Sequence, residues 1–477
     1  MLYPIHIRLH SSVLIAAVFA VLVCAGQLSG CAQATDEVER PPNVLFISID
    51  DLNDWVGALD GHPNARTPNI DRLASLGTVF LNAHTQAPIC GPSRASLMTG
   101  LRPSTTGIYG QIEDKDLRGA HPLLQSAVFL PEYFGQNGYK TMGIGKLFHR
   151  HAPEGVFEES GGRVPGFGPK PPERRYWDQP ETSTDWGPFP ELDEDMPDYQ
   201  SAEWAINRIK QDHDRPFFLA VGFLRPHVPW HVPESWFAMH PVGGITVPPL
   251  LSDDMEDVPA IGHQVADVWQ MPTTAWAIDN NYWPAIVQSY LASVSFVDAQ
   301  VGRILDALET STHSENTVVV LFSDHGYHIG EKNRFAKSSL WERSTRVPLV
   351  FTGPGVAGRQ SVSSAVELLD IYPTLLELAG LPANGEIEGR SLVPLLRESK
   401  SEWPHAAITT YGQNNHAVRT DRFRYIRYED GSEEFYDHIT DPNEWHNLAQ
   451  DSTHRDSISR LTRHLPTRNS VWSSVSQ

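Results

Sequence analysis

Cysteine is scarce in this sequence of 477 residues, which contains only three, at positions 24, 31 and 90. Cys24 and Cys31 lie in an N-terminal segment with the pattern of an export leader, so we expect Cys90 to be the only cysteine of the mature chain. A lone cysteine excludes an internal disulfide framework. Because a free cysteine is most often a small buried hydrophobic residue, Cys90 needs a second indication before it can be assigned a chemical role.

The sequence also has no apolar run long enough for a predicted transmembrane helix. Residues 13–23 are apolar, but a membrane-spanning helix needs roughly 20 residues. With Arg8 as a positive leader, this run is typical of a signal peptide. Because Cys31 follows Leu28-Ser29-Gly30, we predict a lipoprotein signal peptide over 1–30, a lipid anchor at Cys31, and export to the periplasm, outer membrane or cell surface. The alternative is a conventional signal peptide.

Positive charge is in deficit. Lysine and arginine number 37 against 58 acidic residues, a formal net charge of -21. This balance argues against general nucleic-acid binding, which needs a basic face. It does not exclude an anionic substrate, because a local basic pocket can lie in an acidic surface. Hydrophobic residues make up 40% of the chain and charged residues 20%, which excludes a largely disordered protein.

Four apolar runs each lead into polar residues. Their β-branched and aromatic composition predicts buried strands of a parallel sheet. Because sites in open α/β sheets form beyond the carboxyl ends of the strands, we expect the polar residues to meet at one edge. The runs are 43–49, 139–144, 217–224 and 317–322.

Helical patterns separate these runs, so the chain alternates strand and helix and predicts an α/β sandwich with a large, mainly parallel central sheet. The predicted helices cover 69–76, 293–308 and 368–378. Residues 151–198 and 240–285 fit neither pattern, and we expect them to be loops at the rim of a site. The alternative is solvated insertions without a role.

The pattern changes after Pro404. Short strand-like pieces separated by turn residues predict a small antiparallel sheet, followed by a helix over 451–465. The strand pieces are 406–410, 417–420, 423–428 and 434–437. We therefore predict a catalytic domain over 42–400 and a C-terminal subdomain over 401–477.

Two pairs of candidate metal ligands, with three carboxylates between them, follow predicted strands. Asp50-Asp51 ends the first run and Asp324-His325 follows the last. Converging carboxylates repel each other unless a cation neutralises them. Their oxygen ligands favour calcium or magnesium, while His325 leaves room for manganese or zinc. For any single aspartate the alternative is a helix N-cap.

Cys90 opens a helix-like segment. Gly91 and Pro92 suit a turn into a helix start, and Gly100 would end the helix. Free N–H groups at such a start favour an anion. Arg94 adds a permanent positive charge nearby.

The stretch 90–100 resembles the signature of the type I sulfatases, in which the cysteine of a Cys-x-Pro-x-Arg motif is oxidised to formylglycine. Gly91 departs mildly from the usual residue after the cysteine. Further motifs follow the order seen in the iduronate-2-sulfatase branch, and the resemblance covers about residues 42–450. These motifs are Asp50-Asp51-Leu52, residues 145–149, residues 226–229, residues 323–326, residues 335–338 around Lys337, and the closing stretch from Tyr436 to Leu448.

This resemblance implies an alkaline-phosphatase-like fold. It also implies a calcium ion. The ligands of this ion would be Asp50, Asp51, Cys90 as formylglycine, Asp324 and His325. The hydrated aldehyde would be the nucleophile.

The remaining catalytic roles are implied in the same way. Arg94 and Lys146 would hold the hydrate, and Lys337 and His227 would bind sulfate oxygens. His149 would deprotonate the hydrate, and His227 is a candidate general acid for the leaving oxygen.

The resulting functional hypothesis is a sulfuric ester hydrolase that acts on a sulfated saccharide such as ulvan, carrageenan or a glycosaminoglycan, after activation by a formylglycine-generating maturase. A phosphatase or phosphonate monoester hydrolase of the same superfamily is the alternative. A lipoprotein that binds sulfated polysaccharide without hydrolysing it is a third possibility.

Selection of the sugar should come from the two rim loops together with His416 and Arg419. Arg419 could bind a uronate carboxylate in a bidentate manner. Its alternative is a surface arginine paired with a neighbouring acid.

Overall fold

The computed structural model describes residues 40–163 and 166–476. From Pro41 onward the chain forms one compact unit. The predicted signal peptide over 1–30 and the predicted anchor at Cys31 lie outside the described residues. Within the described part, no helix combines the length and the apolar character that crossing a membrane requires.

A mixed sheet of eight strands forms the centre of this unit, in the order β10-β2-β9-β7-β1-β6-β4-β5. Five of its neighbouring pairs are parallel, and only β9 runs antiparallel to its neighbours β7 and β2. A second sheet of three short strands has the order β11-β3-β8. The strands of the two sheets are β1 Asn43–Asp50, β2 Thr78–Phe80, β3 Ala83–His84, β4 Lys140–Gly145, β5 Glu159–Gly162, β6 Phe217–Pro226, β7 Thr317–Ser323, β8 Arg346–Val347, β9 Leu349–Thr352, β10 Gln360–Val362 and β11 Val366–Glu367.

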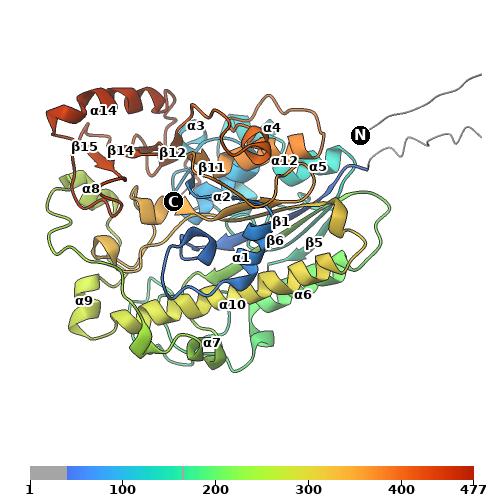
Figure 1. The fold of residues 1–477 in the computed structure, drawn as a ribbon, viewed down its shortest axis with the longest axis horizontal. Helices are drawn as coiled ribbons and strands as arrows, with labels where there is room; N and C mark the ends of the chain where they lie inside the picture. The colour runs from blue at the N-terminus through green and yellow to red at the C-terminus, as the bar shows by residue number, and fades with distance from the viewer. Residues whose placement is uncertain (1–39, 164–165, 477) are drawn as a thin grey trace, which may run out of the picture. The chain divides into compact units, whose positions relative to one another are not determined.

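Helices cover both faces of the central sheet (Figure 1). On one face α1, α6 and α10 pack with Leu45 and Ile47 of β1, whereas on the other α2, α5 and α12 pack with Val44 and Phe46. Alternate residues of one strand therefore serve two cores. The α-helices among the described residues are α1 Pro68–Leu76, α2 Cys90–Thr99, α3 Pro103–Thr106, α4 Pro122–Ser126, α5 Leu130–Gln136, α6 Pro197–Ile209, α7 Glu234–Ala238, α8 Ala260–Val265, α9 Thr274–Asp279, α10 Trp283–Glu309, α11 Glu342–Thr345, α12 Ile371–Leu378, α13 Val393–Arg397 and α14 Arg455–Leu461.

The four predicted runs are neighbours in the sheet, in the order β7-β1-β6-β4. They are parallel, so their carboxyl ends meet at one edge. The register places Ile49 opposite Ser323 and Asp50 opposite Pro226. The predicted mainly parallel sheet and the convergence of its polar ends are thus confirmed.

The C-terminal part contains the predicted four-stranded antiparallel sheet, made of β12 Ala407–Thr410, β13 His416–Arg419, β14 Phe423–Arg427 and β15 Glu433–Asp437. The predicted terminal helix consists of α14 with a short 3-10 helix on each side, Ser452–His454 and Thr462–His464. Because the two parts belong to one compact unit, the proposed boundary between 400 and 401 stays a prediction.

Candidate functional site

The ends of strands β1 and β7 bring Asp50-Asp51 and Asp324-His325 together. The Asp51 backbone N–H donates to Asp324 Oδ1 over 3.2 Å, although the two residues lie 273 positions apart. Asp51 adopts a positive φ of 64°, a conformation that few non-glycine residues adopt. Asp50, Asp51, Asp324 and His325 are all buried. The edge of the sheet therefore carries a concentrated set of oxygen and nitrogen ligands.

Helix α2 presents its first residue, Cys90, to this edge. The helix ends at Gly100, whose φ of 74° suits a glycine C-cap, as the sequence predicts. Two contacts fix its start: Gly91 N–H donates to Gln111 Oε1 over 2.8 Å, and the Ser93 hydroxyl donates to the Asp324 carbonyl over 2.6 Å. Sequence reasoning missed both anchors. Ser93 could have been found inside the cysteine motif, whereas Gln111 gives no signal.

Three buried or half-buried cations join the carboxylates. Arg94 Nε lies 2.7 Å from Asp324 Oδ2, and Lys146 Nζ lies 2.5 Å from Asp50 Oδ2. Lys337 Nζ lies 2.6 Å from Asp51 Oδ1 and 3.0 Å from Cys90 Sγ. The sequence predicts only a metal as the counter-ion of these acids. The structure shows that the protein's own cations share this role.

The two adjacent carboxyls differ in their electrostatics. Burial disfavours the charged form of Asp50, but Lys146, His227 and Arg94 outweigh it and hold its pKa well below the usual value. Burial raises the pKa of Asp51 to about 7, because the Lys337 charge only partly offsets burial and the neighbouring Asp50 charge. Asp51 thus needs further positive charge to remain ionised.

The donor set fits a metal ion. Asp50 Oδ1 and Asp51 Oδ2 are buried and accept no hydrogen bond within the described chain. The ring of His325 is oriented by a 2.9 Å contact between Nδ1 and the Gly326 carbonyl, which leaves Nε2 facing Cys90 Sγ at 3.3 Å. Ligand atoms of Asp50, Cys90, Asp324 and His325 all lie within 4.8 Å of one another.

A second group of similar composition is structural. Glu342, His438 and Glu444 also lie close together. However, Arg424 forms ion pairs with both glutamates, and Arg419 Nε lies 3.1 Å from Glu342 Oε2. These guanidinium groups already neutralise the carboxylates, so the cluster leaves no charge for a cation to balance.

The predicted histidines lie in different environments. His227 Nε2 is 4.0 Å from Asp51 Oδ2, and its ring stacks on Phe167 with centroids 4.6 Å apart. Burial and the charge of Lys337 hold the pKa of His227 well below its usual value. Phe167 belongs to the predicted rim loop over 151–198, but nothing in the sequence distinguishes it as a site residue.

His149 lies beside this cluster and makes no direct hydrogen bond to it within the described chain. Its Nδ1 lies 2.8 Å from the Ile112 carbonyl, next to Gln111. Burial and the charge of Lys146 lower the pKa of His149 to about 4. The other predicted site residues, by contrast, are joined by direct contacts: Asp50, Asp51, Cys90, Arg94, Lys146, His227, Asp324, His325 and Lys337.

The structure does not support the sugar-binding role suggested for Arg419. Its guanidinium is buried and pairs with Glu342, so the alternative of an arginine paired with an acid holds, in a buried rather than a surface position. His416 is also buried, with Nδ1 at 2.9 Å from Thr410 Oγ1.

Comparison with known proteins gives consistent matches. The Sulfatase family model matches residues 42–381, and the model for the N-sulphoglucosamine sulphohydrolase C-terminal region matches 330–470. A sulfatase of Formosa agariphila is 50% identical, covering 93% of this chain and 90% of its own.

Two further relatives have more specific names. Human iduronate 2-sulfatase is 33% identical over 81% of this chain and 77% of its own. A delta 4,5-hexuronate-2-O-sulfatase of Bacteroides thetaiotaomicron is 30% identical over 89% of this chain and 88% of its own. Among solved structures, a phosphonate monoester hydrolase from Silicibacter pomeroyi shares the fold with a TM-score of 0.73 and 20% identity, covering 88% of this chain and 94% of its own.

Proposed function

Because the chain belongs to the sulfatase family and is a sulfuric ester hydrolase, we propose that it removes sulfate from a uronate-containing saccharide, using formylglycine at position 90 and a calcium ion. The observation that carries this proposal is the contact of Cys90 with Lys337 and His325 inside a buried ring of carboxylates. This ring surrounds the one side chain that the Cys-x-Pro-x-Arg motif marks for oxidation.

The metal would be held by Asp50, Asp51, Asp324, His325 and the oxidised residue 90. When bound, calcium would withdraw charge from a sulfate oxygen and favour the ionised form of the aldehyde hydrate. The oxygen-rich donor set suits this ion. One carboxylate oxygen on each of Asp50 and Asp51 accepts no hydrogen bond from the described residues, which supports the assignment.

The chain's own cations would bind the reacting groups. Arg94 is fixed by its ion pair with Asp324, so its guanidinium offers a rigid donor near residue 90. Lys146 and Lys337 approach the same space from β4 and from the segment after β7. Ammonium groups fixed there stabilise negative charge that grows on the sulfate and on the leaving oxygen.

The histidines would move protons. His149 is neutral near pH 7 because its pKa is low, and the contact of Nδ1 with the Ile112 carbonyl leaves Nε2 free to accept a proton. This state suits the role of base toward the second hydroxyl of the hydrate. His227, held against Phe167, is proposed to contact a sulfate oxygen. The negative charge of the bound sulfate ester would favour the protonated imidazolium, which could then donate its proton to the leaving sugar oxygen.

The substrate class rests on the relatives. Iduronate 2-sulfatase and the hexuronate-2-O-sulfatase are named for 2-O-sulfated uronates, and both match most of this chain. We therefore propose a 2-O-sulfated uronate in a glycosaminoglycan or algal polysaccharide. Export as a lipoprotein through Cys31 would bring the enzyme to such a polymer, and a maturase would oxidise Cys90.

The test is turnover by the matured enzyme on defined oligosaccharides that differ only in sulfate position, with aryl sulfate, aryl phosphate and phosphonate monoesters in parallel. We expect the highest kcat/KM on a 2-O-sulfated uronate. Faster turnover of phosphate or phosphonate esters would identify the alternative hydrolase. Peptide mass spectrometry should find formylglycine at position 90, and unmodified cysteine throughout fully active enzyme would refute the mechanism.

A further inference from the structure

A cavity lies at the end of helix α2 that is opposite to Cys90. The helix begins at Cys90 in the catalytic site and ends at Thr99, and Arg102 beyond it lines a cavity of about 450 Å³. Ten helical residues span roughly 15 Å, so this cavity is separate from the site at Cys90. It is formed by three stretches of chain: 102–105, 388–408 and 463–468.

Four of the fourteen residues that line the cavity are arginines. Arg390, Arg463 and Arg468 each line the cavity, and within the described chain none of their side chains forms an ion pair or a hydrogen bond. Arg102 is paired in a bidentate manner with Glu367, at 2.8 and 2.6 Å. In a protein with a net charge of -21, unpaired arginines gathered around one cavity indicate a place for an external anion.

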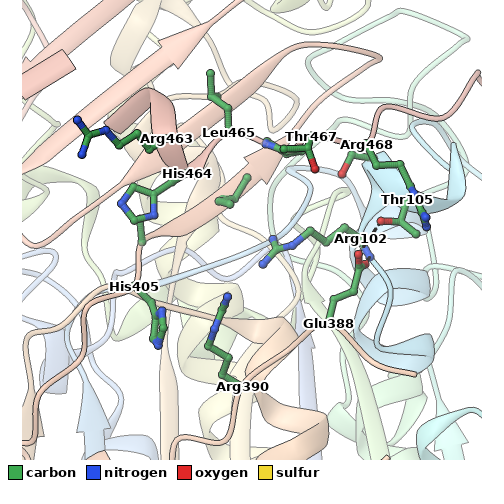
Figure 2. Close-up of a pocket in the computed structure, with 14 residues that line it drawn as sticks. Arg102, Thr105, Glu388, Arg390, His405, Arg463, His464, Leu465, Thr467 and Arg468 are labelled. Atoms are coloured by element: carbon green, nitrogen blue, oxygen red, sulfur yellow. Dashed lines mark hydrogen bonds between the residues drawn. The ribbon is translucent and has the colours of Figure 1, made fainter. Parts of the chain in front are cut away.

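Figure 2 shows how these groups lie. The guanidinium groups of Arg102 and Arg390 extend into the space between the segment carrying His464 and that carrying Glu388, while Arg468 lies on the side of Thr105. The neighbouring histidines respond to this charge. Burial lowers the pKa of His405 and of His464, and the charge of Arg390 lowers both further.

The remaining lining favours a sugar over a bare anion. Glu388 contributes a carboxylate, which already accepts from the Arg102 backbone N–H at 2.6 Å and from the Thr105 hydroxyl at 2.8 Å. A carboxylate repels a free anion but accepts hydrogen bonds from sugar hydroxyls. The exposed Thr467 adds a hydroxyl group, and a volume of this size is typical of sites for small molecules.

We propose that this cavity is a second, non-catalytic binding site for a sulfated sugar unit, with Arg390 and Arg468 binding anionic groups on two sides of it and Glu388 accepting from its hydroxyls. The identity of the sugar rests on the proposed function, whereas the cationic site does not. A polymer held here would remain attached between successive cleavages at Cys90. Inorganic sulfate, the product of the reaction, carries the same anionic group as the sulfated sugar. It is therefore the other ligand to be tested.

The experiment uses the full chain carrying Cys90→Ala, so that the ligand is not consumed, with calcium present. Isothermal titration with a heparin-derived tetrasaccharide should detect two sites. Adding Arg390→Gln and Arg468→Gln should weaken one of them at least about tenfold and leave the other unchanged. The matched control is Arg66→Gln with Arg359→Gln, two exposed arginines outside the cavity, which makes the same change in charge and should retain both sites.

Each result has a defined meaning. Two sites that both survive Arg390→Gln with Arg468→Gln, or a single site unaffected by this pair, would overturn the proposal. Inorganic sulfate that binds the second site as tightly as the tetrasaccharide would overturn its assignment to a sugar. A single site that disappears with the pair would support the second site while contradicting the proposed catalytic substrate.

Activity gives an independent readout. With Cys90 intact, Arg390→Gln with Arg468→Gln should leave turnover of a small aryl sulfate unchanged and raise KM for a long sulfated polysaccharide. Equal KM values for the polymer in this variant and in the Arg66→Gln, Arg359→Gln control would count against the site.

Discussion

Lys337 Nζ lies 3.0 Å from Cys90 Sγ, although the two residues are 247 positions apart in the sequence. The same ammonium group lies 2.6 Å from Asp51 Oδ1. Lys337 therefore connects the residue expected to become the nucleophile with an expected metal ligand. Its side chain is only 16% exposed, so its charge acts in a region from which most water is excluded.

Removing the charge of Lys337 should slow the reaction but leave the metal ligands able to bind calcium. We expect Lys337→Met to lower kcat for any sulfate ester by about 10²–10³-fold, the range found for loss of one preorganised donor. Steady-state kinetics on an aryl sulfate measures the loss, and metal analysis should show that calcium remains bound. A variant with normal kcat would exclude Lys337 from sulfate binding.

The metal assignment predicts a loss of calcium when its ligands are removed. Asp51→Ala combined with Asp324→Ala should abolish stoichiometric calcium and activity, because the remaining donors cannot complete the coordination shell. Elemental analysis of the dialysed protein measures its calcium content. His438→Gln is the matched control, since it alters the arginine-neutralised cluster and should leave calcium in place. Full calcium in the double variant would refute the site.

Arg419 should act on stability and not on sugar choice. In Arg419→Gln, Glu342 keeps its ion pair with Arg424 but loses one partner, and we expect the free energy of unfolding to fall by about 1–3 kcal/mol. Denaturant titration measures this change. The ratio of kcat/KM for a uronate oligosaccharide to that for an aryl sulfate should stay constant. A selective loss on the oligosaccharide would restore Arg419 as a sugar-binding residue.

His416 should make stability depend on pH. Burial lowers its pKa to about 4, below the ordinary value of 6.5. Between these two values the unfolded chain binds a proton that the folded chain does not, so stability decreases as the pH falls through this window. The contribution is at most about 3 kcal/mol.

The measurement compares the free energy of unfolding at pH 7 and at pH 4.5. We expect His416→Asn, which can keep a hydrogen bond to Thr410, to show a smaller decrease than the parent chain. Identical decreases in the two proteins would show that His416 is already protonated in the fold.

Much of the architecture follows from local patterns. Apolar runs of β-branched residues form strands because they bury both faces of a central sheet, and the residues after them must then emerge at its carboxyl edge. Gly91 and Pro92 favour the start of α2, and Gly100 ends the helix through its left-handed backbone conformation. For these reasons the positions of Asp50, Cys90 and Asp324 in the site could be predicted.

Contacts between distant segments could be decided only by the tertiary structure. Arg419 pairs with Glu342 across 77 positions, and Phe167 reaches His227 from a loop without a periodic pattern. The arginines around the cavity beyond α2 come from three separate stretches. A sequence shows which charges and rings exist, but their partners depend on which segments the packed core brings within a few ångströms. Local composition therefore determined which residues lie at the carboxyl edge of the sheet, whereas long-range packing decided which of the described arginines are paired with an acid.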